Sequence, residues 1–115
     1  MADRKGLEKR SPQPWLFVVK SRLGFSVRTT RGYWALITTV KHPNLAGKET
    51  AVIRTLTAPD QVRKSRVDDS VYLFYRKVSK RYLCVVVKRT AERRGFIMTA
   101  HVTEKIKEGR VVWKR

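Results

Sequence analysis

Three apolar segments in the second half of the chain constrain the fold more than any other feature of the sequence. They read VYLFYRKV (71–78), RYLCVVVKR (81–89) and GFIMTAHV (95–102), and only the short polar links SKR and TAERRG separate them. Aromatic and β-branched residues favour strands, and links this short suit antiparallel hairpins. The sequence therefore predicts an antiparallel sheet, in which 81–89, apolar on both faces, is the central strand.

The segments that precede this sheet change from β-type to helical spacing. Residues 15–30 hold two β-rich runs around a turn at Gly24, which predicts a hairpin or two short strands. A helical stripe follows, with Thr29 or Thr30 as N-cap and Pro43 as terminator, and consists of Tyr33, Leu36, Ile37 and Val40. A second stripe before Pro59 consists of Glu49, Val52, Ile53 and Leu56.

These elements predict an α+β fold with two N-terminal helices packed on one face of a mainly antiparallel sheet of four to five strands. We expect TEKIKEG (103–109) to form one or two helical turns, and RVVWK (110–114) to be a last strand. At 115 residues and 42% hydrophobic content, the chain is long enough for one domain over 15–115. Residues 1–14 carry six charges and end near SPQP, so we expect a flexible basic arm there.

The charge of the chain narrows its partners. The chain has 27 Lys and Arg but only 9 Asp and Glu, which gives a formal net charge of +18. Such a charge favours a polyanionic partner such as nucleic acid. The helical segments are not basic on one face, which argues against membrane binding, and MADRKGLEKR lacks the apolar core of a signal peptide. We therefore expect a cytoplasmic protein. Cys84 is the only cysteine and suits a buried small hydrophobe.

Basic and aromatic residues alternate around the predicted strands. Such a mixture suits single-stranded nucleic acid, RNA in preference to DNA, because cations hold phosphates while rings stack on bases. The aromatic candidates are Tyr72, Tyr75 and Tyr82, and the basic candidates are Arg63, Lys64, Arg66, Lys88 and Arg89. Two histidines, one cysteine and scattered acids predict neither a metal site nor a cofactor.

The stretch FIMTAHVT (96–103) carries a candidate site. Strand alternation places Phe96, Met98, Ala100 and Val102 on the core face, and Ile97, Thr99 and His101 on the opposite one. His101 is then either hydrogen-bonded inside the fold or part of a partly open functional face. His42, the other histidine, either caps the end of the first helix or joins the same site.

Three stretches together resemble small bacterial and phage proteins of the barnase, EndoU, colicin tRNase and RelE-like nuclease superfamily. They are HPNLAGKETAVIRTLTAPDQVRKSRVDDSVYLFYR, YLCVVVK and GFIMTAHVTEKIKEGRVVWK, and the likeness spans roughly 31–115. The resemblance implies a metal-independent ribonuclease in which a ribose 2′-hydroxyl attacks the adjacent phosphate with help from a general base, a general acid and cations.

By position, His42, Arg76 and Thr99 match places where such relatives carry polar residues. His101 stands where relatives often have tyrosine, which keeps acid–base capability near neutral pH. Leu36 stands where they often have histidine, which removes a possible general base.

The leading hypothesis is a metal-independent endoribonuclease, toxin-like or phage-associated. His42 and His101 are its acid–base candidates, while Thr99 orients the phosphate and Arg76 stabilises charge. The alternative is a noncatalytic RNA- or DNA-binding or ribosome-associated protein on the same fold. An acidic antitoxin as partner is compatible with either hypothesis.

Overall fold

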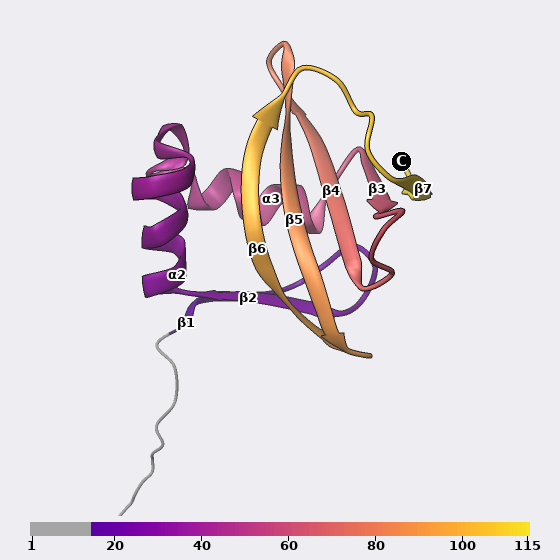
Figure 1. The fold of residues 1–115 in the computed structure, drawn as a ribbon, viewed down its shortest axis with the longest axis horizontal. Coiled ribbons are helices and arrows are strands. Elements are labelled where there is room, and N and C mark those ends of the chain that lie inside the picture. The colour runs from indigo at the N-terminus through magenta and orange to yellow at the C-terminus, as the bar shows by residue number, and fades with distance from the viewer. Residues whose placement is uncertain (1–14) are drawn as a thin grey trace, which may run out of the picture.

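The computed structural model describes residues 15–115, so the basic arm predicted for residues 1–14 lies outside the described residues. Its elements in chain order are β1 (Trp15–Lys20), β2 (Ser26–Thr30), α2 (Arg31–Leu36), η1 (Ile37–Lys41), η2 (Pro43–Leu45), α3 (Glu49–Thr57), β3 (Gln61–Lys64), β4 (Val71–Val78), β5 (Arg81–Ala91), β6 (Arg94–Thr103) and β7 (Arg110–Lys114). The class is α+β, as predicted, because two helices pack on one open sheet (Figure 1).

The strands form a single seven-stranded sheet in the order β1-β2-β6-β5-β4-β3-β7. Every pairing is antiparallel except that of β2 with β6. The predicted central position of 81–89 is confirmed, since β5 is the fourth of the seven strands. The prediction of four to five strands behind N-terminal helices is wrong, because the β1–β2 hairpin precedes the helices and joins the sheet. The short, polar β3 adds a further strand.

The first helix begins where the sequence predicts, but it buries a different face. The Thr30 hydroxyl caps it by accepting the Tyr33 N–H at 3.0 Å. Trp34 and Ile37 are buried, whereas Leu36 is 44% and Val40 70% exposed, so the predicted stripe is wrong at those two positions. Because the large Trp34 ring is buried, the helix is rotated about its axis relative to the orientation that the predicted stripe implied. The wider π-helical turn of η1 then moves Val40 out of line with the face that Ile37 occupies.

The main core lies between the helices and one face of the sheet, which we call the helix face. Helix α3 contributes Val52 and Leu56, both fully buried as its stripe predicts. From the sheet, the core receives Val62, Phe74, Leu83, Val85, Val87, Ile97 and Ala100. The opposite face, which we call the open face, holds a smaller buried cluster of Leu73, Tyr75 and Cys84.

Residues 104–109, which we call the crossover segment, run from β6 to β7 across the open face and place Ile106 on its apolar cluster. The prediction of helical turns here is wrong. From β6 to β7 the chain crosses four strand spacings, or about 19 Å at 4.7–4.9 Å each. The seven steps from Thr103 to Arg110 cover about 10 Å as a helix but about 23 Å when extended, so only an extended segment reaches β7.

A β-bulge at Met98 changes the alternation of side chains along β6. Ile97 pairs with Val87 and Thr99 with Val86, which leaves Met98 as the extra residue between them. As a result, Ile97 is fully buried on the helix face, while Phe96 is 41% exposed on the open face. The predicted orientations of these two side chains are therefore wrong. Beyond the bulge the prediction is confirmed, since Ala100 is buried on the helix face.

Within residues 15–115, no helix is long and apolar enough to cross a membrane.

Candidate active site

The two histidines of the chain lie together, with 5.9 Å between their ring centroids and 36° between their planes. We call them the histidine pair. His42 follows η1, and its backbone N–H closes the π-helical turn by donating to the Ile37 carbonyl at 2.7 Å. His101 lies on β6, opposite Cys84 of β5, and both residues are on the open face. The histidine pair therefore lies where the end of a helix comes close to the end of a strand.

Helix α2 reaches His101 because half of β6 is a free edge. Strand β2 pairs with β6 only as far as Phe96, which leaves the rest of β6 without a strand on that side. There the Tyr33 hydroxyl donates to the Met98 carbonyl at 2.6 Å, which fixes the helix along the edge. Helix α2 continues directly into η1, which ends at Lys41, and the next residue, His42, lies beside His101. Figure 1 shows α2 beside β6.

The surroundings of His101 favour its neutral form. Burial lowers the pKa of His101, and the nearby charge of His42 lowers it further, while Glu108 acts in the opposite direction. Two cationic rings at this distance repel each other. The pair therefore places a neutral imidazole, which can accept a proton, beside a second imidazole.

A cleft of about 540 Å³ opens between His101 and the crossover segment. The crossover segment lines it with two lysines and two glutamates, namely Glu104, Lys105, Lys107 and Glu108. Tyr75 lies at its base, next to Cys84. Burial raises the pKa of the Tyr75 hydroxyl, and it raises the pKa of the Cys84 thiol to about 12. Both groups are neutral at pH 7, so neither supplies a nucleophile.

The other two residues predicted for catalysis do not reach the histidine pair. Thr99 is on the open face, two pairing rows from His101, but it does not line the cleft. Its hydroxyl oxygen is buried and has no hydrogen-bond partner among the described residues. Arg76 pairs with Leu83, a residue of the main core, and strand geometry therefore directs it to the helix face, away from His101.

Most of the basic residues predicted for nucleic-acid contacts are bound within the fold. Arg63 donates to the side chain of Gln61 and to two carbonyls of the crossover segment. Arg89 donates to the Glu92 carbonyl and lies 4.6 Å from the Phe25 ring centroid. Lys64 lies over the Tyr72 ring, 5.5 Å from its centroid, while Arg66 is exposed. Of the five, Arg66 is the most accessible to a phosphate.

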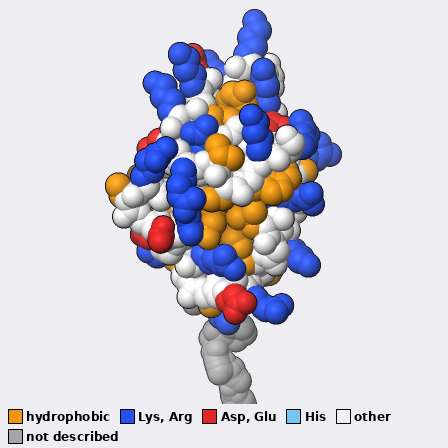
Figure 2. Space-filling view, turned by 90° about the vertical axis from the view of Figure 1, so that its right-hand side faces the viewer, with side chains coloured by type: hydrophobic (Ala, Val, Ile, Leu, Met, Phe, Trp, Pro, Cys, Tyr) orange, Lys and Arg blue, Asp and Glu red, His pale blue; other side chains and the backbone are white. Residues whose placement is uncertain are grey.

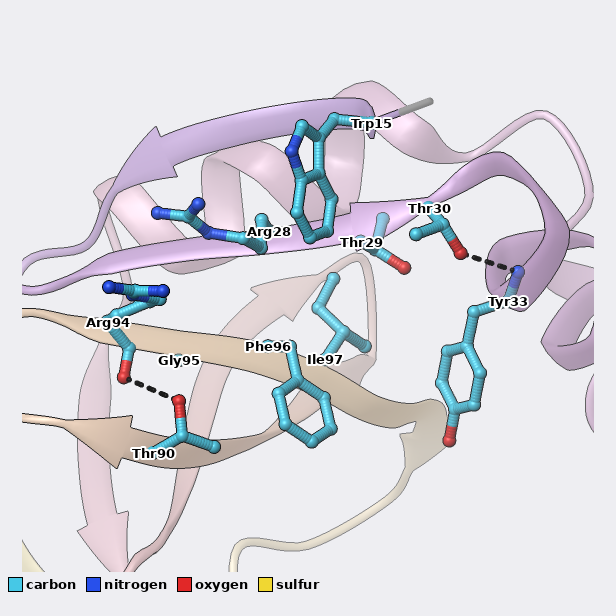
Figure 3. Close-up of a pocket in the computed structure, with 10 residues that line it drawn as sticks. All are labelled: Trp15, Arg28, Thr29, Thr30, Tyr33, Thr90, Arg94, Gly95, Phe96 and Ile97. Atoms are coloured by element: carbon cyan, nitrogen blue, oxygen red, sulfur yellow. Dashed lines mark hydrogen bonds between the residues drawn. The ribbon is translucent and has the colours of Figure 1, made fainter. Parts of the chain in front are cut away.

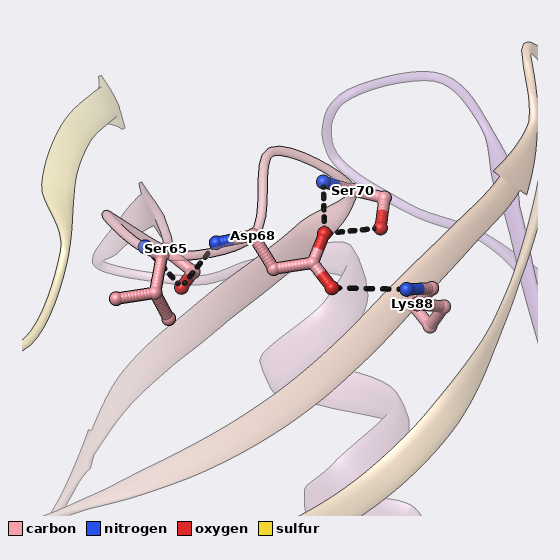
Figure 4. A network of polar contacts seen from close by, with 5 residues as sticks. Ser65, Asp68, Ser70 and Lys88 are labelled. Atoms are coloured by element: carbon pink, nitrogen blue, oxygen red, sulfur yellow. Dashed lines mark hydrogen bonds and ion pairs between the residues drawn. The ribbon is translucent and has the colours of Figure 1, made fainter.

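Lys88 belongs to a polar network around Asp68 (Figure 4). Its ammonium group is 2.9 Å from one Asp68 oxygen, while the other oxygen accepts the backbone N–H and the hydroxyl of Ser70. The two Ser70 hydrogen bonds, with Lys88 adding to them, hold the pKa of Asp68 well below its usual range. The network shows that Lys88 already has an anionic partner.

Two of the three predicted tyrosines are closed to a ligand, while Tyr82 is partly exposed. Tyr72 is 7% and Tyr75 only 2% exposed, so stacking of bases on either ring is excluded in this fold. Trp15 and Phe96, at 40% and 41% exposure, are accessible instead. They line a pocket with Arg28 and Arg94 between β2 and β6 (Figure 3). The sequence showed the aromatic at position 96, but alternation assigned it to the core because the bulge was not anticipated.

The surface on the side of β3 and β7 is strongly cationic. Figure 2, seen from the side of β3 and β7, shows Lys and Arg side chains distributed around a central apolar patch, with few acidic side chains between them. This distribution agrees with the net charge of +18 and favours an extended anionic partner.

Comparison of the chain with models of protein families, with curated proteins and with solved structures finds no match. Within residues 15–115, no three side chains of His, Cys, Asp or Glu are grouped as a metal ion would need.

Proposed function

We propose that the protein binds single-stranded RNA and cleaves it without a metal ion. The observation that carries this proposal is the histidine pair, which brings together two acid–base side chains from distant parts of the chain. One of the two, His101, lines a cleft. The charge of +18 supports the choice of a polyanionic substrate. The resemblance to the barnase and RelE-like superfamily also implies two helices followed by an antiparallel sheet, and after the β1–β2 hairpin the chain continues in that order.

In the proposed reaction, neutral His101 accepts the proton of a ribose 2′-hydroxyl while its oxygen attacks the adjacent phosphorus. The bond from phosphorus to the 5′-oxygen breaks, and protonated His42 gives its proton to that oxygen. The products are a 2′,3′-cyclic phosphate and a free 5′-hydroxyl. With 5.9 Å between their ring centroids, the two imidazoles lie side by side, close enough to reach two oxygens of one phosphate group bound across them.

The roles first assigned to Arg76 and Thr99 change in this proposal. Because Arg76 is directed to the other face, Lys105 and Lys107 of the crossover segment become the candidates for stabilising charge on the phosphoryl oxygens. Glu104 and Glu108 line the same cleft, and their negative charge partly offsets the positive charge of the two lysines.

A noncatalytic RNA-binding protein is the second candidate, and the position of Arg76 favours it. An active site that lacks a guanidinium beside its acid–base pair has weaker support for charge on the phosphate. Both candidates predict RNA binding that weakens steeply with salt, with a slope of log K against log salt of about −0.7 for each phosphate neutralised.

The experiment that separates them is incubation of the purified protein with end-labelled single-stranded RNA in excess EDTA, with analysis of the product ends. The ribonuclease proposal predicts 2′,3′-cyclic phosphate ends that are lost in His101→Ala. They should persist in Val40→Ala, a control at an exposed position of the same helix region as His42. RNA that is bound but stays intact would contradict the catalytic proposal and support the noncatalytic one.

A further inference from the structure

The pocket between β2 and β6 exists because these two strands separate. They pair in parallel only where Ser26, Val27 and Arg28 face residues 94–96. Beyond that point Thr29 pairs with Phe17 of β1 and has no partner on β6. The space left between the strands measures about 310 Å³, at the lower end of the range of small-molecule sites. It therefore suits one small ligand.

The pocket is mostly apolar and aromatic. Ile97, which the bulge at Met98 directs to the helix face, is fully buried and belongs to its lining. Trp15, Tyr33 and Phe96 add three rings, of which Trp15 and Phe96 are about two-fifths exposed. Gly95 also lines it, and a Cβ there would lie 2.8 Å from the Lys88 carbonyl oxygen. Aromatic side chains in this number favour a planar ring as ligand.

One end of the pocket is cationic. Figure 3 shows the guanidinium groups of Arg28 and Arg94 together at that end, with Thr29, Thr30 and Tyr33 at the other. Arg28 lies over Trp15, 5.2 Å from the ring centroid, and donates to the Ser26 hydroxyl. Among the described residues, neither arginine is ion-paired with a carboxylate. Two neighbouring guanidinium groups without a carboxylate favour a phosphate.

Unpartnered polar atoms provide the second, independent observation. Thr29 is only 3% exposed, and its hydroxyl oxygen has no hydrogen-bond partner among residues 15–115. The Nε of Arg28 is likewise buried and unpartnered. Both side chains line the pocket. Buried polar atoms are nearly always hydrogen-bonded, so a ligand that supplies the missing partners explains why they are retained.

We propose that this pocket binds a single nucleotide, with its base among Trp15, Tyr33 and Phe96, its phosphate on Arg28 and Arg94, and the edge of its base on the Thr29 hydroxyl. The source of that nucleotide is a single-stranded RNA, and this part rests on the proposed function. Phe96 and His101 are on the same face of β6 and five residues apart, about 16 Å. A short strand of RNA that starts in the pocket therefore reaches the histidine pair.

The test is isothermal titration calorimetry of the full chain with 5′-mononucleotides and with ribose 5-phosphate, which lacks a base. We expect at least one mononucleotide to bind about tenfold more tightly than ribose 5-phosphate. Thr29→Val replaces the hydroxyl by a methyl group of similar size. It should weaken binding of the mononucleotide about five- to tenfold and leave binding of ribose 5-phosphate unchanged. Loss of a buried, unpartnered hydroxyl does not destabilise the fold, which keeps this variant interpretable. Arg94→Ala should weaken both ligands about tenfold.

Arg54→Ala removes an exposed arginine of α3 outside the pocket and should leave both affinities unchanged. Equal binding of mononucleotides and ribose 5-phosphate, or no effect of Thr29→Val, would overturn the proposal. The same variants titrated with a short single-stranded RNA identify the source. If the variants bind the RNA more weakly than the wild type does, the pocket binds a nucleotide of an RNA strand. If their RNA affinity is unchanged, the pocket binds a free mononucleotide. These titrations measure binding and need no cleavage. A protein that cuts RNA but binds no mononucleotide would therefore contradict the pocket proposal and leave the ribonuclease proposal intact.

Discussion

Replacing Ile97 by alanine should destabilise the protein more than replacing Phe96, although phenylalanine is the larger residue. Ile97 is fully buried in the main core, and removing a buried isoleucine side chain costs about 2–5 kcal/mol, which includes the cavity it leaves. Phe96 is 41% exposed and borders an open pocket. Full burial of such a side chain contributes about 1.5–3 kcal/mol, so its partial burial gives a loss of about 1–2 kcal/mol for Phe96→Ala.

The assay is urea unfolding of both variants at 25 °C, followed by far-UV circular dichroism. The m-values should stay the same, and the free energy of unfolding should fall further in Ile97→Ala, by about 1–3 kcal/mol relative to Phe96→Ala. Uninterrupted strand alternation predicts the reverse order, with Phe96 in the core and a cost of about 3–5 kcal/mol for Phe96→Ala. If Phe96→Ala is the more destabilising variant, the bulge at Met98 and the pocket built on it are refuted.

Three further predictions concern the glycine, arginine and histidine at the crossover segment and the candidate active site. Gly109→Ala should lose about 1–3 kcal/mol in urea unfolding, because Gly109 has φ +81° and a Cβ would meet the Lys64 carbonyl oxygen at 2.7 Å. Gly32→Ala, where the added methyl has open space, should lose nothing. Arg63→Ala removes the hydrogen bonds to the crossover segment and should lower the free energy of unfolding by about 1–2 kcal/mol. Arg66→Ala, at an exposed position, should change it by no more than about 0.5 kcal/mol. Equal losses in the two variants would contradict a stabilising role of the Arg63 hydrogen bonds. Because the folded-state pKa of His101 lies below its ordinary value of 6.5, the unfolded chain binds more protons, and the unfolding free energy should rise as pH is raised up to about 6.5 and then level off. Unfolding curves at several pH values should show this slope in the wild type and lose it in His101→Gln.

The sequence predicted the elements whose signal is local. Strands β4, β5 and β6 each have an apolar run and a short hairpin link, and the stripe of α3 correctly places Val52 and Leu56 in the core. The N-cap at Thr30 and the turn at Gly24, with φ +101°, also depend only on neighbouring residues. Patterns of this kind act within a few residues, so they are visible before any tertiary contact is known.

Features that depend on tertiary contacts were not predictable in the same way. Strand β3 reads QVRK and becomes a strand only because β4 and β7 pair with it on either side. The bulge at Met98 reverses two side chains without any mark in the local pattern. His42 and His101 were both named as candidates, but their proximity follows from the free edge of β6 and the Tyr33 hydrogen bond to Met98, which no spacing in the sequence indicates.

The central claim is that His42 and His101 act on one phosphate as a unit, and the most direct measurement is a double-mutant cycle on RNA cleavage in EDTA. Single-turnover rates would be compared for the wild type, His42→Ala, His101→Ala and the double variant. The account predicts that each single change lowers the rate about as much as the double change, because an acid and a base that serve one reaction fail together. Independent, multiplicative losses, or unchanged cleavage in either single variant, would contradict it.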